Sequence, residues 1–81
     1  MKNGLRSMEG DSVPPLKHGL LALASGNYFE LQVCKSQAGY YIGTLNASGE
    51  PYTRESQEYW VDRAQAEIAL RDGRWTQKPS L

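Results

Sequence analysis

The chain has 81 residues, and its nine lysines and arginines balance its nine aspartates and glutamates, so the formal net charge is zero. This length supports one domain with a small hydrophobic core, and it excludes a cofactor domain beside a separate substrate domain. The charge balance argues against a protein that grips nucleic acid, because phosphate contacts usually require a positive excess.

The first 15 residues show neither a helical nor a strand period, so we predict a disordered N-terminal arm followed by a single domain over residues 16–81. Met1 and Met8 are both possible translation starts. No long apolar run follows the first residues, so no secretory signal is expected. The longest apolar run, residues 20–24, is far shorter than the roughly 20 residues of a membrane span, and we expect a cytoplasmic protein with no membrane partner.

The next two segments differ in their hydrophobic period. Residues 16–25 place leucines about one helical turn apart, which indicates a short helix or an irregular apolar segment. Residues 27–35 alternate between apolar and polar side chains, which predicts a half-buried strand. Cys34, the single cysteine, lies in this strand, and we interpret it as a small buried hydrophobic residue.

Two further strands are expected before the end of the chain. Residues 40–45 are rich in side chains that suit a pleated surface, and Gly43 within them indicates a bulge or the close approach of a large neighbour. Residues 46–51 form an exposed loop. Residues 57–61 then form a short third strand.

The clearest local signal is the start of a helix. Asp62 is placed to cap it, and Gln65, three residues later, completes a capping box. Val61 stands where a hydrophobic staple needs an apolar residue. The helix is predicted over residues 63–72, and Gly73 is placed to end it in a left-handed conformation.

The two sides of this helix have different roles. Ala66, Ala69 and Leu70 form a face of mostly small side chains that packs closely on a sheet. Glu67 and Arg71, four residues apart, are expected to pair on the surface. The predicted fold class is therefore α+β: a three-stranded antiparallel sheet with one C-terminal helix packed on one face, in the order β-β-β-α.

The function is expected to lie in the aromatic side chains of the strands. One helix covers one face of the sheet, so several rings must lie on the other face, and tyrosine, tryptophan and arginine are enriched at binding hot spots. The predicted partner-binding residues are Tyr40, Tyr41, Tyr52, Arg54, Tyr59 and Trp60. Two alternatives remain open: the leucine segment covers this face as a second core layer, or the face pairs with itself in a homodimer.

Chemistry other than binding has little support in the sequence. His18 is the single histidine and has no predicted nucleophile beside it, so we expect no enzyme, no catalytic residue and no small-molecule substrate. No metal-ligand spacing or phosphate-binding glycine loop is present, so no metal and no cofactor are expected. A nucleic-acid-binding β-β-β-α module ranks below a protein-binding one, because acidic residues are interleaved with the basic residues of the second half.

A distinctive residue pattern runs through the chain from Phe29 onward. It consists of AGYYIGT at 38–44, RES at 54–56, EYW at 58–60, AE at 66–67, AL at 69–70 and GRWTQ at 73–77. In this pattern the chain resembles a group of small, uncharacterised bacterial and prophage-type proteins. The resemblance implies no particular activity. It implies a context in which small phage-type accessory or inhibitor proteins bind a host protein and block or redirect it.

Overall fold

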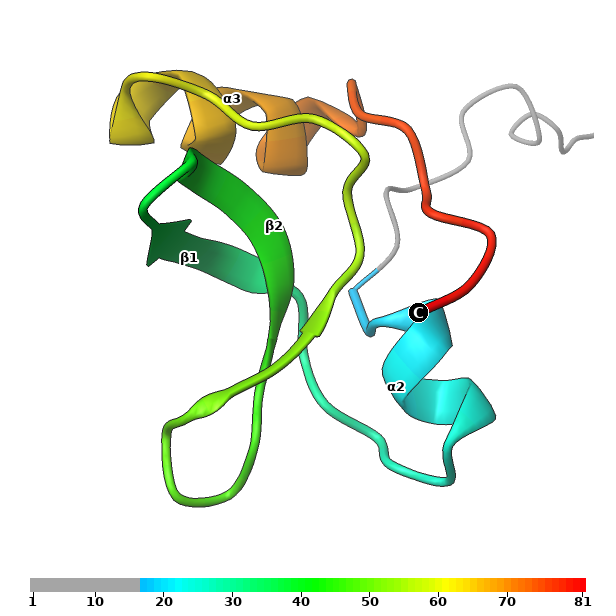
Figure 1. Ribbon diagram of the computed structural model, residues 1–81. Coiled ribbons are helices and arrows are strands. Elements are labelled where there is room, and N and C mark those ends of the chain that lie inside the picture. The colour runs from blue at the N-terminus through cyan, green and yellow to red at the C-terminus, as the bar shows by residue number, and fades with distance from the viewer. Residues whose placement is uncertain (1–16) are drawn as a thin grey trace, which may run out of the picture.

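The computed structural model describes residues 17–81, so the predicted N-terminal arm lies outside the described residues. The elements in chain order are α2 (Leu20–Ala24), β1 (Gln32–Ser36), β2 (Gly39–Leu45), β3 (Pro51–Arg54) and α3 (Arg63–Asp72) (Figure 1). The three strands form one antiparallel sheet in the order β1-β2-β3, which confirms the predicted fold class. None of the helices in residues 17–81 is long and apolar enough to cross a membrane.

The register of β1 against β2 decides which side chains share a face of the sheet. Val33 lies opposite Ile42, and Cys34 lies opposite Tyr41. Because successive side chains of a strand point to opposite faces, the first pair and the second pair lie on different sides. Ile42 packs against Ala69 of α3. We call the side of the sheet that carries Val33 and Ile42 the helix face, and the side that carries Cys34 and Tyr41 the reverse face.

The first strand is shorter than the predicted range of 27–35. Residues before Gln32 pair with the segment that enters α2 instead of with β2. The Gly19 N–H donates to the Phe29 carbonyl at 3.0 Å, and the Leu31 N–H donates to the Lys17 carbonyl at 2.7 Å. The alternating pattern is therefore real, but its first half and second half have different partners.

The third strand lies at Pro51–Arg54, and its prediction at residues 57–61 was wrong. The predicted loop is a tight turn, because the Asn46 side-chain oxygen accepts hydrogen bonds from the N–H groups of Ser48 and Glu50 at 2.9 and 3.0 Å. The chain then returns at once beside β2, and a proline at the first position of an edge strand leaves no ladder donor unpaired inside the sheet.

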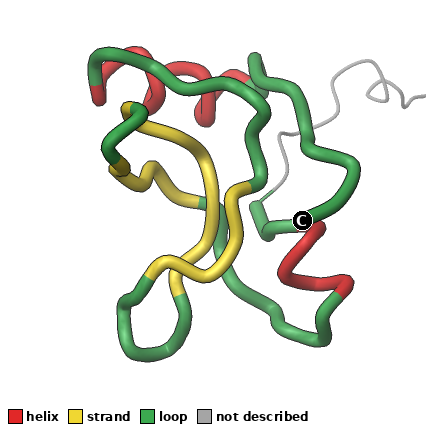
Figure 2. The backbone as a smooth tube through the Cα atoms, in the orientation of Figure 1, coloured by secondary structure: helices red, strands yellow, loops and turns green. Residues whose placement is uncertain are grey.

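Residues 57–61 belong to an irregular connection between β3 and α3 (Figure 2). Trp60 alone pairs with β2, exchanging two hydrogen bonds of 2.8 Å with the backbone of Tyr40. β3 and Trp60 therefore follow the same edge of β2, with Glu55 and Ser56 between them, where both N–H groups donate to the Ile42 carbonyl.

Helix α3 has the predicted bounds, and Gly73 ends it at φ 68°, in the left-handed region. The predicted capping box was wrong: the Asp62 backbone is extended as a cap requires, but its side chain accepts no cap hydrogen bond. The staple is also absent, since Val61 is 88% exposed. Glu67 pairs with Arg63, four residues before it, at 3.3 Å and not with Arg71.

The predicted packing face of α3 is confirmed. Ala66 and Ala69 are buried, and Ala69 joins Leu31 and Ile42 in the hydrophobic core. The partly buried side chains packed against this cluster are Trp60, Leu70 and Trp75. Small residues on α3 let its backbone lie close to the sheet, so the larger rings of the flanking segments close the open sides of the core.

The carboxylate of Glu55, which has no exposed surface, joins three separate parts of the chain. It accepts hydrogen bonds from the first-turn N–H groups of Leu21 and Ala22 at 3.0 and 3.1 Å. The hydroxyl of Thr53 donates to it at 2.6 Å, and the side-chain amide of Gln77 donates at 2.8 Å. Glu55, directly after β3, thus supplies the cap that α2 lacks in its own sequence, where the N-cap residue is a glycine.

These contacts place α2 on the helix face, beside β3. Thr44, next but one to Ile42 and hence on the same face, shares a 2.6 Å hydroxyl hydrogen bond with Thr53 beneath the Glu55 carboxylate. Leu21 and Ala22 are the buried residues of α2, whereas Leu20 and Leu23 of the predicted leucine stripe are exposed. Within the described residues, the leucine segment does not cover the reverse face.

Gly19 leaves room for this arrangement. A Cβ at this position would lie 2.5 Å from Oε2 of Glu55 and 2.6 Å from Cγ2 of Thr44. The glycine that weakens the helical pattern in the sequence is therefore the residue that lets α2 begin directly over the buried carboxylate.

We expect Glu55→Gln to lower the free energy of unfolding by about 1–3 kcal/mol. The glutamine keeps one acceptor oxygen, but its NH2 group would face N–H and O–H groups that also donate. Urea denaturation measures the loss. The control is Glu67→Gln, which breaks an exposed ion pair and should change stability by less than about 1 kcal/mol. Equal effects of the two substitutions would contradict this role of Glu55.

The stability of the fold should also depend on pH through this group. Burial raises the pKa of Glu55, but the hydrogen bonds from Leu21, Thr53, Gln77 and Ala22 outweigh burial and hold the pKa below its ordinary value of 4.5. A lowered pKa in the folded state contributes stability above about pH 4.5, and this stability is lost as the pH falls toward the folded-state pKa. Denaturation midpoints measured between neutral and acidic pH should fall less steeply in Glu55→Gln than in the parent chain.

We expect Gly19→Ala to destabilise the fold by about 1–3 kcal/mol, because the added methyl group collides with Glu55 and Thr44. Thermal unfolding followed by circular dichroism measures the change. An unchanged midpoint would show that α2 moves away from the carboxylate without cost.

Candidate functional site

The reverse face of the sheet carries the candidate site, a group of three residues that we call the reverse-face cluster: Tyr41, Arg54 and Tyr59. Gly43 provides its floor, since a Cβ there would lie 2.8 Å from Cε2 of the Tyr41 ring and would also strike the Thr53 carbonyl oxygen. The close approach predicted at Gly43 is confirmed. It allows the Tyr41 ring to lie along the sheet, where it is only 7% exposed.

The other two members of the cluster cover this ring from outside. Tyr59 meets Tyr41 edge to face, with ring centroids 6.0 Å apart and planes at 76°. Arg54, which lies opposite Gly43 in the register of β2 and β3, holds its guanidinium carbon 4.6 Å from the centre of the Tyr59 ring. Tyr59 is 41% exposed, so the cluster presents an aromatic surface held by a cation on one side and a buried ring on the other.

Cys34 lies beneath the same face, opposite Tyr41, and is buried. Burial raises the pKa of the Cys34 thiol above its ordinary value, and it likewise raises the pKa of the Tyr41 hydroxyl. A thiol is a weak nucleophile while it stays protonated, so this environment favours a packing role for the cysteine.

The remaining predicted partner-binding residues lie elsewhere. Tyr40 is on the helix face, where Lys35 lies over its ring at 5.6 Å. Trp60 is half-buried and packs against the core. Tyr52 lies at the far end of β3, where its hydroxyl hydrogen-bonds to Ser25 and Asn27 at 2.8 and 2.7 Å. The structure thus brings three of the six predicted residues together.

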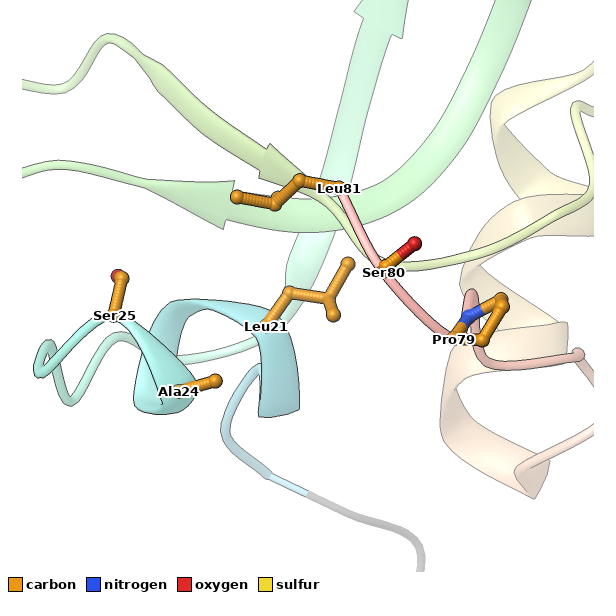
Figure 3. Close-up of a pocket in the computed structure, with 6 residues that line it drawn as sticks. All are labelled: Leu21, Ala24, Ser25, Pro79, Ser80 and Leu81. Carbon is orange, nitrogen blue, oxygen red and sulfur yellow. The ribbon is translucent and has the colours of Figure 1, made fainter.

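A cavity of about 440 Å³ between α2 and the C-terminal segment was not predicted (Figure 3). Figure 3 shows Leu21 pointing from α2 toward that segment. The residues that line the cavity are Leu21, Ala24, Ser25, Pro79, Ser80 and Leu81. The side chains of the lining are uncharged and mostly apolar, apart from the hydroxyl groups of Ser25 and Ser80. No signal in the sequence indicates that the C-terminal segment returns to α2.

Among residues 17–81, no group of three or more His, Cys, Asp and Glu side chains is placed to hold a metal ion. His18 stacks on Tyr28, with ring centroids 3.8 Å apart and planes at 15°. The exposed aromatic ring of Tyr28 therefore has a partner outside the reverse-face cluster. Comparison with protein-family models, with curated proteins and with solved structures finds no match to this chain.

The buried thiol gives a direct test of how well the reverse face is covered. We expect Cys34 in the folded chain to react with a disulfide reagent at least about tenfold more slowly than in the denatured chain, because it is buried and its pKa is raised. Absorbance of the released thiolate at neutral pH measures both rates. Equal rates would show that Cys34 is accessible to the reagent in the folded chain.

Proposed function

We propose that this protein is a non-enzymatic binding module that recognises a protein partner through the reverse-face cluster. The observation that carries the proposal is the half-exposed ring of Tyr59, held in place by Tyr41 on one side and Arg54 on the other. A ring that is already ordered loses little conformational entropy when a partner packs on it. Tyrosine and arginine are also the residue types that most often dominate binding energy.

The position of the cluster supports the same proposal. Both α2 and α3 lie on the helix face, and on the reverse face Tyr41 and Cys34 are buried whereas Tyr59 is exposed. A partner can therefore contact Tyr59 without displacing core side chains. The resemblance to prophage-type proteins supports a narrower form of the proposal, in which the chain is an accessory or inhibitor protein that binds a host protein.

We expect Tyr59→Ala to abolish recovery of the partner while the fold is retained, because the substitution removes the exposed ring. The measurement is affinity capture from a bacterial lysate with quantitative mass spectrometry, using the full chain as bait. Circular dichroism checks that the variant is folded.

The matched control is Tyr28→Ala, which removes a ring that is 72% exposed but lies outside the cluster. This variant should recover the same protein in the same amount as the parent chain. A stoichiometric partner that is retained by Tyr59→Ala and lost with Tyr28→Ala would place the contact surface elsewhere and overturn the proposal.

A further inference from the structure

We infer that the reverse-face cluster binds a carboxylate-bearing protein segment, with the guanidinium of Arg54 as the anchor and the exposed part of the Tyr59 ring as the platform beside it. The inference rests on the proposed function and adds to it the chemistry of the partner: an aspartate or glutamate next to an apolar side chain. The argument comes from the geometry, the hydrogen bonding and the charge of Arg54.

Arg54 is held in place, but no side chain or backbone group of residues 17–81 uses its guanidinium donors. The guanidinium carbon lies 4.6 Å from the centre of the Tyr59 ring. The pairing of Arg54 with Gly43 in the sheet fixes the position of the Arg54 backbone. No side-chain hydrogen bond from Arg54 to any of residues 17–81 is formed. An arginine presents five N–H donors in a flat fork that matches the two oxygens of a carboxylate, so a stacked and unsatisfied guanidinium suits that group.

The charge of Arg54 also lacks a partner within the described part of the chain. Arg63 pairs with Glu67 at 3.3 Å and Arg71 pairs with Asp72 at 2.9 Å, whereas no carboxylate of residues 17–81 pairs with Arg54. Burial raises the pKa of Tyr41, and the positive charge of Arg54 opposes this rise, so that charge acts across the face. An anionic group docking here meets a positive charge that no carboxylate of residues 17–81 compensates, on a protein whose formal net charge is zero.

A protein carboxylate fits this site better than a nucleic-acid backbone. Nucleic acid gains its affinity from several phosphate contacts along a track of cations. Here Arg63 and Arg71 of α3 are paired with Glu67 and Asp72, and the reverse-face cluster itself holds one cation beside one exposed ring. A single bidentate pair with an apolar contact beside it is the pattern of a protein hot spot.

The test selects peptides from a random dodecapeptide display library on the full-length chain and measures binding of the enriched peptides by fluorescence polarisation. We expect enrichment of aspartate or glutamate. Arg54→Gln should weaken binding roughly 10- to 100-fold, and so should converting the peptide carboxylate to its amide. The two changes together should cost little more than either alone, because they remove the same pair.

Two further variants separate charge from fork geometry and from general effects. Arg54→Lys keeps the charge without the planar fork, so it should recover part of the affinity. Arg71→Gln removes an exposed arginine that is paired with Asp72 outside the cluster, and it should leave binding unchanged. Circular dichroism and thermal unfolding establish that all variants are folded.

The outcomes distinguish the inference from the proposed function. Binding that is lost in Tyr59→Ala but unchanged in Arg54→Gln overturns the carboxylate anchor and leaves the proposed surface standing. Binding unchanged in both variants, or no enriched peptide at all, overturns both. Binding of a single-stranded oligonucleotide that depends on Arg54, without any peptide binding, assigns the site to nucleic acid and overturns the inference.

Discussion

The fold depends on one buried carboxylate. Glu55 joins α2, β3 and the C-terminal segment, because four donors from these three parts of the chain converge on its two oxygens. A small domain has few apolar contacts to hold short elements, and a five-residue helix is not stable by itself. A buried charge that is fully hydrogen-bonded can fix such a helix in one position, whereas the same charge without its donors would destabilise the fold.

The residues around Glu55 also connect parts of the residue pattern that lie far apart in the sequence. Glu55 accepts from Gln77, and the Glu58 carboxylate accepts from the Thr76 N–H at 2.9 and 3.0 Å. The residues RES and EYW are thus joined to WTQ by hydrogen bonds. Ser56 adds a link to the sheet, since its hydroxyl accepts from the Ile42 N–H at 3.0 Å. Four residues of the pattern, Glu55, Ser56, Glu58 and Gln77, therefore have a structural role in holding these segments together.

Local signals in the sequence were enough for α3 and for β2, but not for the parts that depend on distant contacts. The small-residue face and Gly73 predict α3 correctly, because helix bounds follow from neighbouring residues. The third strand was misplaced because two segments pair with the same edge of β2: β3 at residues 51–54 and Trp60 at a single bridge. The aromatic content of residues 57–61 favours the second segment when only the sequence is considered. In the site, Tyr41, Arg54 and Tyr59 were predicted from residue type, whereas the separation of Tyr40, Tyr52 and Trp60 follows from strand register and burial.

The contact between Glu55 and Gln77 has a consequence for the order of events during synthesis. The α2 segment leaves the ribosome first, yet the carboxylate that caps it comes more than 30 residues later and receives its last donor later still. Until Gln77 has emerged, the Glu55 carboxylate lacks one of its four donors, so the set of contacts that holds α2 in place is complete only once the C-terminal segment has been made.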